Sequence, residues 1–243
     1  MAISKNIFHK IDANEEYIRR YSFRLKMKKI EDSNFLNNYI RFPSGFVDFG
    51  GWPISADLGV SLINSIKKNS YSGVLEFGSG LSTVIFNKVL NGRGVPILSI
   101  EHNEVYLIKS RKILFECALK NDGLILAELS NIEIYGREYL FYDCFEKLND
   151  WERSMPISTG RRKLLLLIDG PPAKTCHLAR FPSLIYASKV FIGWDIHVFL
   201  DDFNRDEEKE IAFSWKKIFG PAIENWCESK DYDKGLLTFV LRN

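Results

Sequence analysis

The sequence has few cysteines and almost no excess of charge. Its 243 residues include four widely spaced cysteines without a Cys-x-x-Cys pair: Cys117, Cys144, Cys176 and Cys227. This spacing argues against a zinc finger and predicts reduced, partly buried thiols. The formal net charge is +2, from 33 basic and 31 acidic residues, so the chain as a whole has no electrostatic drive toward nucleic acid or membrane.

Long apolar runs are missing as well. The longest, residues 164–168, is far too short to cross a bilayer, and residues 1–10 lack the continuous apolar core of a signal peptide. No internal repeat or low-complexity tract is present. We therefore expect a cytoplasmic protein without a membrane span. A hydrophobic content of 46% is enough for a full core in a chain of this length.

One local stretch is strongly basic. Residues 19–29 contain no acid, and aromatic and apolar residues alternate with six basic ones: Arg19, Arg20, Arg24, Lys26, Lys28 and Lys29. The simplest interpretation is a solvated helix face, because long basic side chains commonly cover apolar surface. Binding of a polyanion, a phosphorylated substrate or a membrane surface is the alternative.

The chain divides into an N-terminal extension and one larger domain. Residues 1–45 predict a helical cap, with helices near residues 15–29 and 32–39, and residues 46–243 form the main domain. Turns at residues 42–45 and 50–53 mark the entry to that domain. Ser55 is placed to cap a helix over residues 56–68, whose apolar side chains share one face.

Strands and helices alternate through the main domain, which favours an α/β fold with a mainly parallel sheet covered on both faces. The predicted strands are residues 74–77, 96–101, 132–135, 163–168 and 197–200, with a β-rich end at 235–241. The predicted helices between them are residues 81–90, 104–120, 177–188 and 206–219.

The first strand runs into a glycine turn and then a helix. Gly78 and Gly80 allow the backbone to approach a ligand closely, and the free N–H groups of the following helix face the same place. This pattern indicates a cradle for a nucleotide cofactor. A dinucleotide fingerprint would have a third glycine or an alanine where Ser82 and Thr83 stand, and here an acid, Glu76, precedes the turn.

Acidic residues end most of the predicted strands. Glu76 and Glu101 end the first two, Asp169 follows the fourth, and Asp201 and Asp202 follow the fifth. Because the carboxyl ends of parallel strands meet at one edge of a sheet, we expect these side chains to surround one site. A purely structural sheet has no need for so many acids there.

The segment Glu76-Phe77-Gly78-Ser79-Gly80 resembles the first motif of the class I S-adenosylmethionine (SAM)-dependent methyltransferases, an acid followed by Gly-x-Gly after the first strand. The resemblance continues at residues 99–102, 168–172, 179–182 and 199–205, and it covers roughly residues 50 to 241. It is closest to small-molecule and sugar O-methyltransferases. It implies a Rossmann-like domain with a mostly parallel seven-stranded sheet and helices on both faces.

The resemblance also implies which residues bind SAM. Gly78, Ser79 and Gly80 would pass close to its methionine part, and Glu76 would hydrogen-bond the amino group directly or through water. Glu101 would accept hydrogen bonds from both ribose hydroxyl groups.

Two further positions would lie near the adenine. These are His102 and the loop at Gly136 and Arg137, which is predicted to follow the third strand. A surface side chain is the alternative interpretation of His102.

Asp169, Asp201 and Asp202 offer three hard oxygen ligands of the kind that suits Mg²⁺. Metal-dependent O-methyltransferases of catechols and macrolide sugars are similar in placing an acid after strand four and Asp-Asp or Asp-Asn after strand five. Such a cation binds the acceptor oxygen and lowers its pKa. Alternatively, Asp169 shapes the turn before Gly170, and the other two acids cap the next helix and line the pocket.

The general base is the least defined residue. Catechol-type enzymes place a lysine three residues after the first acid, where this chain has Pro172. Lys174 and His177 are nearby substitutes, and His177 titrates near neutral pH, although a loop or capping histidine is the alternative. The pair Tyr142-Asp143 and Trp52 are candidates for lining the acceptor pocket, but core packing explains such aromatics equally well.

The resemblance, together with the acidic strand ends, therefore implies O-methylation of a sugar, a nucleotide-linked sugar or another small polyhydroxylated acceptor, with Mg²⁺ assistance as an option. Residues 170–173 lack the polar and aromatic residues of the nucleobase N-methyltransferase signature, so duplex DNA is not an expected substrate. A methyltransferase of RNA or protein, using residues 19–29, is the main alternative. A non-catalytic module with a cofactor fold is another, and a homo-oligomer stays open.

Overall fold

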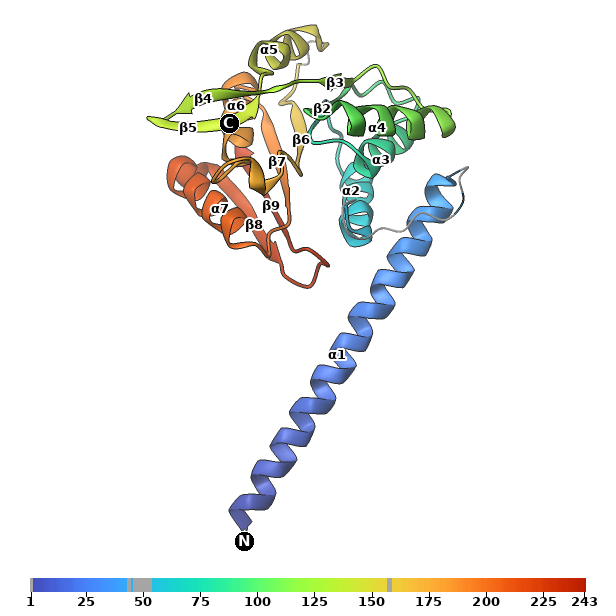
Figure 1. Ribbon diagram of the computed structural model, residues 1–243, viewed down its shortest axis with the longest axis vertical. Coiled ribbons are helices and arrows are strands. Elements are labelled where there is room, and N and C mark those ends of the chain that lie inside the picture. Colours follow the sequence, from blue (N-terminus) through green and yellow to red (C-terminus); the bar gives the residue numbers. More distant parts are fainter. Residues whose placement is uncertain (1, 43–44, 46–53, 157–158) are drawn as a thin grey trace.

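The computed structural model describes residues 2–42, 45, 54–156 and 159–243, with side chains from residue 16 onward (Figure 1). Its centre is a seven-stranded sheet in the order β3-β2-β1-β6-β7-β9-β8. The strands are β1 (Gly73–Phe77), β2 (Ile97–Glu101), β3 (Leu124–Leu126), β6 (Lys163–Ile168), β7 (Asp195–Asp201), β8 (Ile223–Ser229) and β9 (Leu236–Arg242). Within the described residues, β9 runs in the opposite direction to the other six strands, so β7 and β8 both pair with it in antiparallel fashion. The predicted Rossmann-like fold with a mostly parallel seven-stranded sheet is confirmed.

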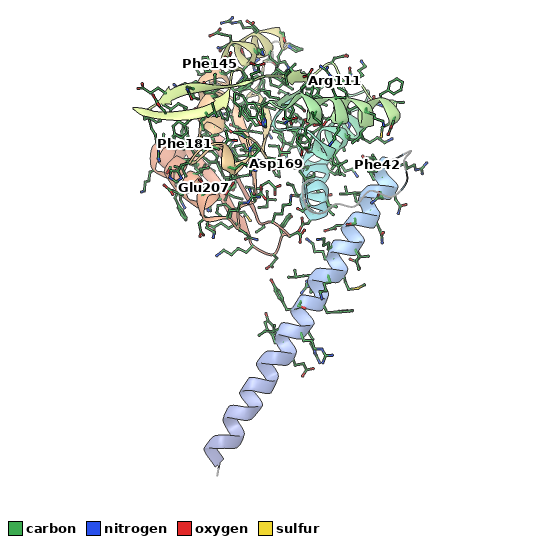
Figure 2. The ribbon with its side chains drawn as sticks, in the orientation of Figure 1. Phe42, Arg111, Phe145, Asp169, Phe181 and Glu207 are labelled. Atoms are coloured by element: carbon green, nitrogen blue, oxygen red, sulfur yellow. The ribbon has the colours of Figure 1, made fainter. Side chains whose placement is uncertain are left out.

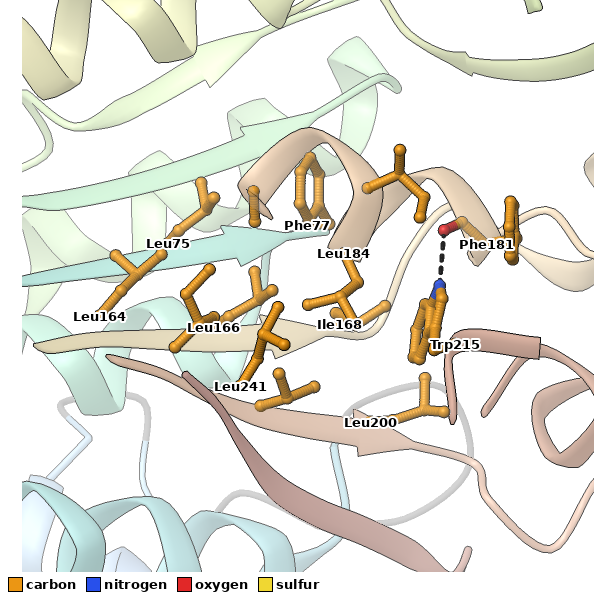
Figure 3. Packing of buried hydrophobic residues seen from close by; sticks show 14 of the residues in the cluster. Leu75, Phe77, Leu164, Leu166, Ile168, Phe181, Leu184, Leu200, Trp215 and Leu241 are labelled. Atoms are coloured by element: carbon orange, nitrogen blue, oxygen red, sulfur yellow. Dashed lines mark hydrogen bonds between the residues drawn. The ribbon is translucent and has the colours of Figure 1, made fainter. Parts of the chain in front are cut away.

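The leucine-rich strand β6 explains why the sheet is covered on both faces. Leu164, Leu166 and Ile168 belong to one buried cluster, whereas Leu165 and Leu167 belong to another. Figure 3 shows the first cluster between the sheet and the helices above it. A continuous apolar strand of this kind is stable only where helices remove both of its faces from water.

Helices from the two halves of the chain cover opposite faces. The cluster containing Leu165 includes residues of α2 (Ala56–Lys68), α3 (Leu81–Val89) and α4 (Glu104–Glu116). The cluster containing Leu164 includes residues of α5 (Phe145–Ser154), α6 (Phe181–Val190) and α7 (Asp206–Phe219). Short 3₁₀ helices lie at Ala173–Thr175 and Gly220–Ala222.

The elements predicted at residues 56–68, 163–168 and 206–219 have these bounds in the structure, and most other predicted elements shift by a few residues. The structure also contains α5 and β8, which were not predicted. Ser55 is the N-cap residue of α2, although its side chain makes no capping hydrogen bond. Helix α4 ends four residues early, because Ala118 just beyond it takes a left-handed conformation with φ of 53°. The helix expected from residue 177 begins at Phe181, since Leu178 also has a positive φ, 56°.

The prediction that residues 132–135 form the third strand of the sheet is wrong. The third parallel strand is β3, whose three residues are too few to show a pattern in the sequence. Residues 132–134 belong to β4 (Leu129–Ile134), which pairs with β5 (Arg137–Tyr142) in a separate hairpin. Tyr135 and Gly136 both have positive φ, 52° and 73°, as the turn of a two-residue hairpin requires.

The N-terminal extension is one long helix, α1 (Ala2–Ile40), where we predicted two shorter ones. Its C-terminal part packs on α2 through the buried Leu36 and Ile40, while its N-terminal part extends away from the domain (Figure 1). Of the turns predicted before α2, the Gly45 N–H donates to the Phe42 carbonyl, and residues 50–53 lie outside the described residues. The division at residues 45 and 46 stays a prediction.

Part of the basic stretch contacts the loop between β8 and β9. Lys29 Nζ donates to Asp233 Oδ2 at 2.9 Å, and Lys28 Nζ lies 4.8 Å from the centre of the Tyr232 ring. The side chains of Tyr21 and Asp231 are also in contact. The basic residues nearer the N-terminus, from Arg19 to Lys26, are exposed.

All four cysteines are unpaired, and Cys144 is buried. Across the described residues, the structure contains no helix with the length and hydropathy needed to cross a membrane.

The core makes a direct stability prediction. Leu166 is fully buried in the central strand, so Leu166→Ala should lower the free energy of unfolding by about 2–5 kcal/mol through lost burial and a new cavity. Ile192→Ala is the matched control, since 77% of Ile192 is exposed, and it should change stability by less than about 0.5 kcal/mol. Urea denaturation measures both, and similar losses for the two variants would contradict this description of the core.

Candidate functional site

The carboxyl ends of the central strands are held level with one another. Phe77 of β1 pairs with Ile100 of β2 and with Ile168 of β6, and Ile168 pairs in turn with Leu200 of β7. The acids that follow these pairs therefore come to one edge of the sheet, as the order of predicted strands required. We call this place the carboxyl edge.

The glycine turn after β1 lies against the end of β6. Gly78 has φ of 104°, and a Cβ atom added to it would lie 3.4 Å from the carbonyl carbon of Asp169. This position therefore needs glycine for its left-handed backbone conformation, while a Cβ atom would be in ordinary contact with Asp169. A Cβ added to Gly80 would meet no atom of the described residues within 4 Å, so open space lies beside the turn.

Glu76 lies completely buried beneath this turn. Its Oε2 accepts hydrogen bonds from Ser99 Oγ at 2.6 Å and from Thr83 Oγ1 at 2.7 Å. Its Oε1 has no hydrogen-bond partner among the described residues. Burial raises the pKa of Glu76 to about 7, although the hydroxyl groups favour its charged form. The carboxylate thus keeps one unused acceptor that a proton or an ammonium group would satisfy.

Glu101, at the end of β2, is held as a charged carboxylate. Its Oε1 accepts the Asn103 N–H at 2.8 Å, its Oε2 accepts the Ser79 hydroxyl at 3.0 Å, and His102 Nδ1 lies 3.1 Å from Oε1. Burial alone would raise the pKa of Glu101, but the nearby His102 ring and the hydrogen bonds from Asn103 and Ser79 outweigh it and lower the pKa. Such a carboxylate is well suited to accept hydroxyl hydrogens.

Tyr142 brings an unused hydroxyl group to the same edge. Its ring packs edge-on against His102 at 5.8 Å and tilted against Phe77 at 5.7 Å. The hydroxyl is buried without a partner among the described residues, and a Cβ on Gly170 would lie 2.3 Å from it. Burial, with the charges of Glu101 and Asp169, holds the pKa of Tyr142 well above its usual value, so it remains a donor.

The placement of Gly136 and Arg137 after the third strand is wrong. They lie at the turn of the β4-β5 hairpin, which extends away from β2 and β3 in Figure 1, and the Arg137 guanidinium lies over the Tyr139 ring. The third strand is instead followed by Ala127, whose N–H donates to the Glu101 carbonyl, and by Glu128, whose carbonyl accepts the Asp143 N–H. The hairpin therefore brings Asp143 to this side of the sheet.

Asp169, Asp201 and Asp202 lie together at the ends of β6 and β7. One carboxylate oxygen from each lies within 4.8 Å of the others. Both carboxylate oxygens of Asp201 are buried without a partner among the described residues, and burial next to Asp169 and Asp202 raises its pKa well above the usual range. Burial also raises the pKa of Asp169, to about 6, although Arg180 opposes this.

Arg180 occupies the middle of this acidic cluster, and our sequence analysis did not identify it as a functional residue. Its side chain is 4% exposed, and its Nη2 donates to Asp202 Oδ2 at 2.9 Å and to the Asp169 carbonyl at 3.2 Å. Its Nη1 donates to the Asp201 carbonyl at 3.2 Å, and its Nε to the Pro171 carbonyl at 3.3 Å. The only signal in the sequence was its place in the motif at residues 179–182.

Lys234 is a second missed cation. It lies on the loop between β8 and β9, close enough to Asp169 and Asp201 for its charge to lower the pKa of both. Its carbonyl accepts the Asn204 N–H at 3.1 Å, and the loop is held further by the Asp233 N–H, which donates to Asp57 Oδ2 at 2.8 Å. No motif in the sequence links this loop to the carboxyl edge.

The two candidate bases lie elsewhere. His177 is half exposed, and its Nδ1 lies 3.1 Å from Glu207 Oε1 on α7. Figure 2 shows Glu207 at the outer margin of the domain, whereas Asp169 lies near its centre. Lys174 is exposed on the 3₁₀ helix Ala173–Thr175. The structure thus favours the alternative of a loop histidine, and Trp52 lies outside the described residues.

The raised pKa of Glu76 predicts a pH-dependent stability. Its pKa is about 7 in the folded protein against 4.5 as the reference, so the folded state binds this proton more tightly and loses stability as pH rises through this interval. Glu76→Gln should therefore gain stability relative to wild type between about pH 5 and pH 8, by up to roughly 3 kcal/mol. Urea denaturation of both proteins at both pH values tests this. The prediction is contradicted if the variant and wild type differ in free energy of unfolding by the same amount at both pH values.

No protein-family model matches this chain, and no curated protein matches it in sequence. Solved structures share its fold, among them three with bound SAH or SAM. An O-methyltransferase from Bacillus cereus in complex with SAH is 14% identical, with a TM-score of 0.53 over 79% of this chain and 84% of that one. SAH-bound PaMTH1 from Podospora anserina is 14% identical, with a TM-score of 0.52 over 95% and 97%. TomG from Streptomyces achromogenes with SAM is 13% identical, with a TM-score of 0.52 over 88% of each chain. The chain therefore has the Rossmann-like fold of class I methyltransferases.

Proposed function

We propose that this protein is a SAM-dependent methyltransferase that methylates an oxygen atom of a small acceptor. The observation that carries the proposal is the arrangement at the carboxyl edge. An open glycine turn lies between the charged Glu101 and the partly exposed Asp169, with unused hydrogen-bonding groups buried around it. The shared fold of the solved methyltransferases supports this assignment of the edge.

The residues around the turn fit SAM in chemical type. Residues 78–80 would contact its methionine part, and the unused Oε1 of Glu76 suits the amino group. Glu101 offers a charged acceptor to the ribose hydroxyls, and the Tyr142 hydroxyl is an unused donor. When bound, SAM supplies an electrophilic methyl group on a sulfonium centre.

Asp169 is the residue best placed to accept the acceptor's proton. It follows β6 directly beside Gly78, and its side chain is 23% exposed. A base should have a pKa near the working pH, and the pKa of Asp169 is about 6. Its carboxylate would take the hydroxyl proton as the acceptor oxygen attacks, while the surrounding residues hold that oxygen in line.

A sugar is our proposed acceptor. The proposal rests on the resemblance to sugar O-methyltransferases and on the several carboxylates at the carboxyl edge, which can accept hydrogen bonds from more than one hydroxyl group. The RNA alternative would use residues 19–29, but Lys28 and Lys29 already contact the loop at residues 231–233.

Magnesium fits this site less well than the sequence indicated. Asp169, Asp201 and Asp202 have suitable oxygen atoms, but the Arg180 guanidinium already donates to Asp202 and lies 3.4 Å from Asp169 Oδ1. The Asp201 oxygens are closed off from solvent, whereas Mg²⁺ usually keeps several waters. No step proposed for this protein therefore uses a metal ion.

Cofactor binding is testable by calorimetry. Glu101→Ala should weaken SAM binding about 10–100-fold, because charged hydrogen bonds to the ribose are lost, and Gly78→Arg should abolish binding. Arg137→Ala, at the hairpin turn, is the matched control and should leave the affinity unchanged. Absence of wild-type binding at millimolar SAM would refute the proposed function.

The base assignment is testable by transfer of a labelled methyl group into small molecules of a cell extract. Asp169→Asn should reduce the rate by about 10²–10⁴-fold while SAM binding persists, since only proton acceptance is removed. His177→Gln should retain nearly full activity, because this side chain pairs with α7. The opposite ranking of the two variants would show that Asp169 is not the base.

A further inference from the structure

We propose that Arg180 takes the place of a divalent cation at the carboxyl edge, so that this protein binds no metal between Asp169 and Asp202 and needs none for turnover. The claim that no metal binds depends only on the geometry of the site. The claim that turnover needs no metal rests on the proposed function.

The geometry places one guanidinium where a metal would join the same strand ends. Its nitrogens donate to the main-chain carbonyls of Asp169, Pro171 and Asp201, and to the carboxylate of Asp202. These contacts join the end of β6 to the end of β7. A planar guanidinium with five donors can satisfy several acceptors at fixed angles, as a bound cation otherwise would.

The site already holds cations opposite its acids. Arg205 Nη1 lies 2.9 Å from Asp202 Oδ2 and 3.6 Å from Glu208 Oε1, and the buried Glu208 also lies 3.6 Å from Arg180 Nη1. With Lys234, whose charge acts on Asp169 and Asp201, three basic side chains lie near these four acids. Buried charges are tolerated when they are paired and hydrogen-bonded, and Asp202 meets that condition without a metal, whereas the Asp201 carboxylate oxygens and Glu208 Oε2 have no hydrogen-bond partner among the described residues.

A divalent cation would have to bind next to the positive charge of the Arg180 guanidinium. Mg²⁺ binds oxygen at about 2.0–2.1 Å, so an ion shared by Asp169 and Asp202 would lie beside the Arg180 nitrogens that donate to them. Asp201 remains as a ligand, but both of its oxygens are buried and leave no exposed face for the waters that Mg²⁺ keeps. Two of the three candidate ligands, Asp169 and Asp202, are therefore already engaged by Arg180, and the third is closed to solvent.

The consequence for the reaction is that Arg180 is a positioning residue. It holds the main chain of Asp169 and lies 3.4 Å from its Oδ1, and so fixes the direction of the carboxylate that we propose as the base. In metal-assisted transfer the cation would orient the acceptor oxygen directly.

The first test uses Mn²⁺ as the probe on the full-length wild-type protein. Free Mn²⁺ gives an electron paramagnetic resonance signal that decreases on binding. We expect no site with a dissociation constant below about 1 mM, and turnover should change less than about twofold when EDTA is added. Micromolar Mn²⁺ binding that disappears in Asp201→Asn would overturn the proposal.

The second test removes the guanidinium. Arg180→Gln leaves the carboxylates without their central cation, so about 1 mM Mn²⁺ should raise its thermal unfolding midpoint while the wild-type midpoint stays unchanged. Arg162→Gln is the matched control, because Arg162 pairs with Glu152 outside this network and metal should not affect it. A folded Arg180→Gln variant whose thermal unfolding midpoint does not rise with Mn²⁺ would count against the proposal.

The two tests separate this inference from the proposed function. If Arg180→Gln does not fold, the wild-type Mn²⁺ titration still decides the metal question. If wild type binds SAM and transfers methyl groups only with added metal, the function stands and this inference fails. If wild type binds neither SAM nor Mn²⁺, the proposed function fails. The inference that Arg180 takes the place of a metal among the carboxylates then still stands.

Discussion

The pairing of β1 with both β2 and β6 is the constraint on which the rest of this structure depends. It keeps the ends of the strands level, so that residues from distant parts of the sequence, such as Glu101 and Asp169, meet on either side of the glycine turn. A shift of one residue along either strand would turn the side chains to the opposite face and separate these groups. The leucines of β6 secure the register, because they must fill both apolar faces at once.

This level edge concentrates acidic groups, and their burial costs stability. The raised pKa values of Glu76, Asp169 and Asp201 show that burial opposes their charged forms. Buried carboxylates with unused oxygens serve no purpose in a structural sheet, whereas binding and catalytic sites commonly contain such groups. The large apolar core on both faces of the sheet offsets their cost, and Arg180 offsets part of it locally.

The N-terminal helix is connected to the same edge through one loop. Lys29 binds Asp233, and the next residue along the chain, Lys234, faces Asp169 and Asp201. The basic stretch that stood out in the sequence is therefore divided. Its C-terminal part helps to hold a loop at the site, and its exposed part keeps the polar surface of a solvated helix.

The sequence by itself determined the central strands, the glycine turn and the acids at the ends of β1, β2, β6 and β7, because these depend on local periodicity and on the common direction of parallel strands. It did not reveal α5, β8 or the short β3, or the hairpin that carries Arg137 away and brings Tyr142 in. The tertiary structure alone decided that Arg180 and Lys234 face the acids, that His177 does not, and that a guanidinium lies among the carboxylates that were candidate metal ligands. Those outcomes depend on contacts between residues far apart in the chain, which no local pattern encodes.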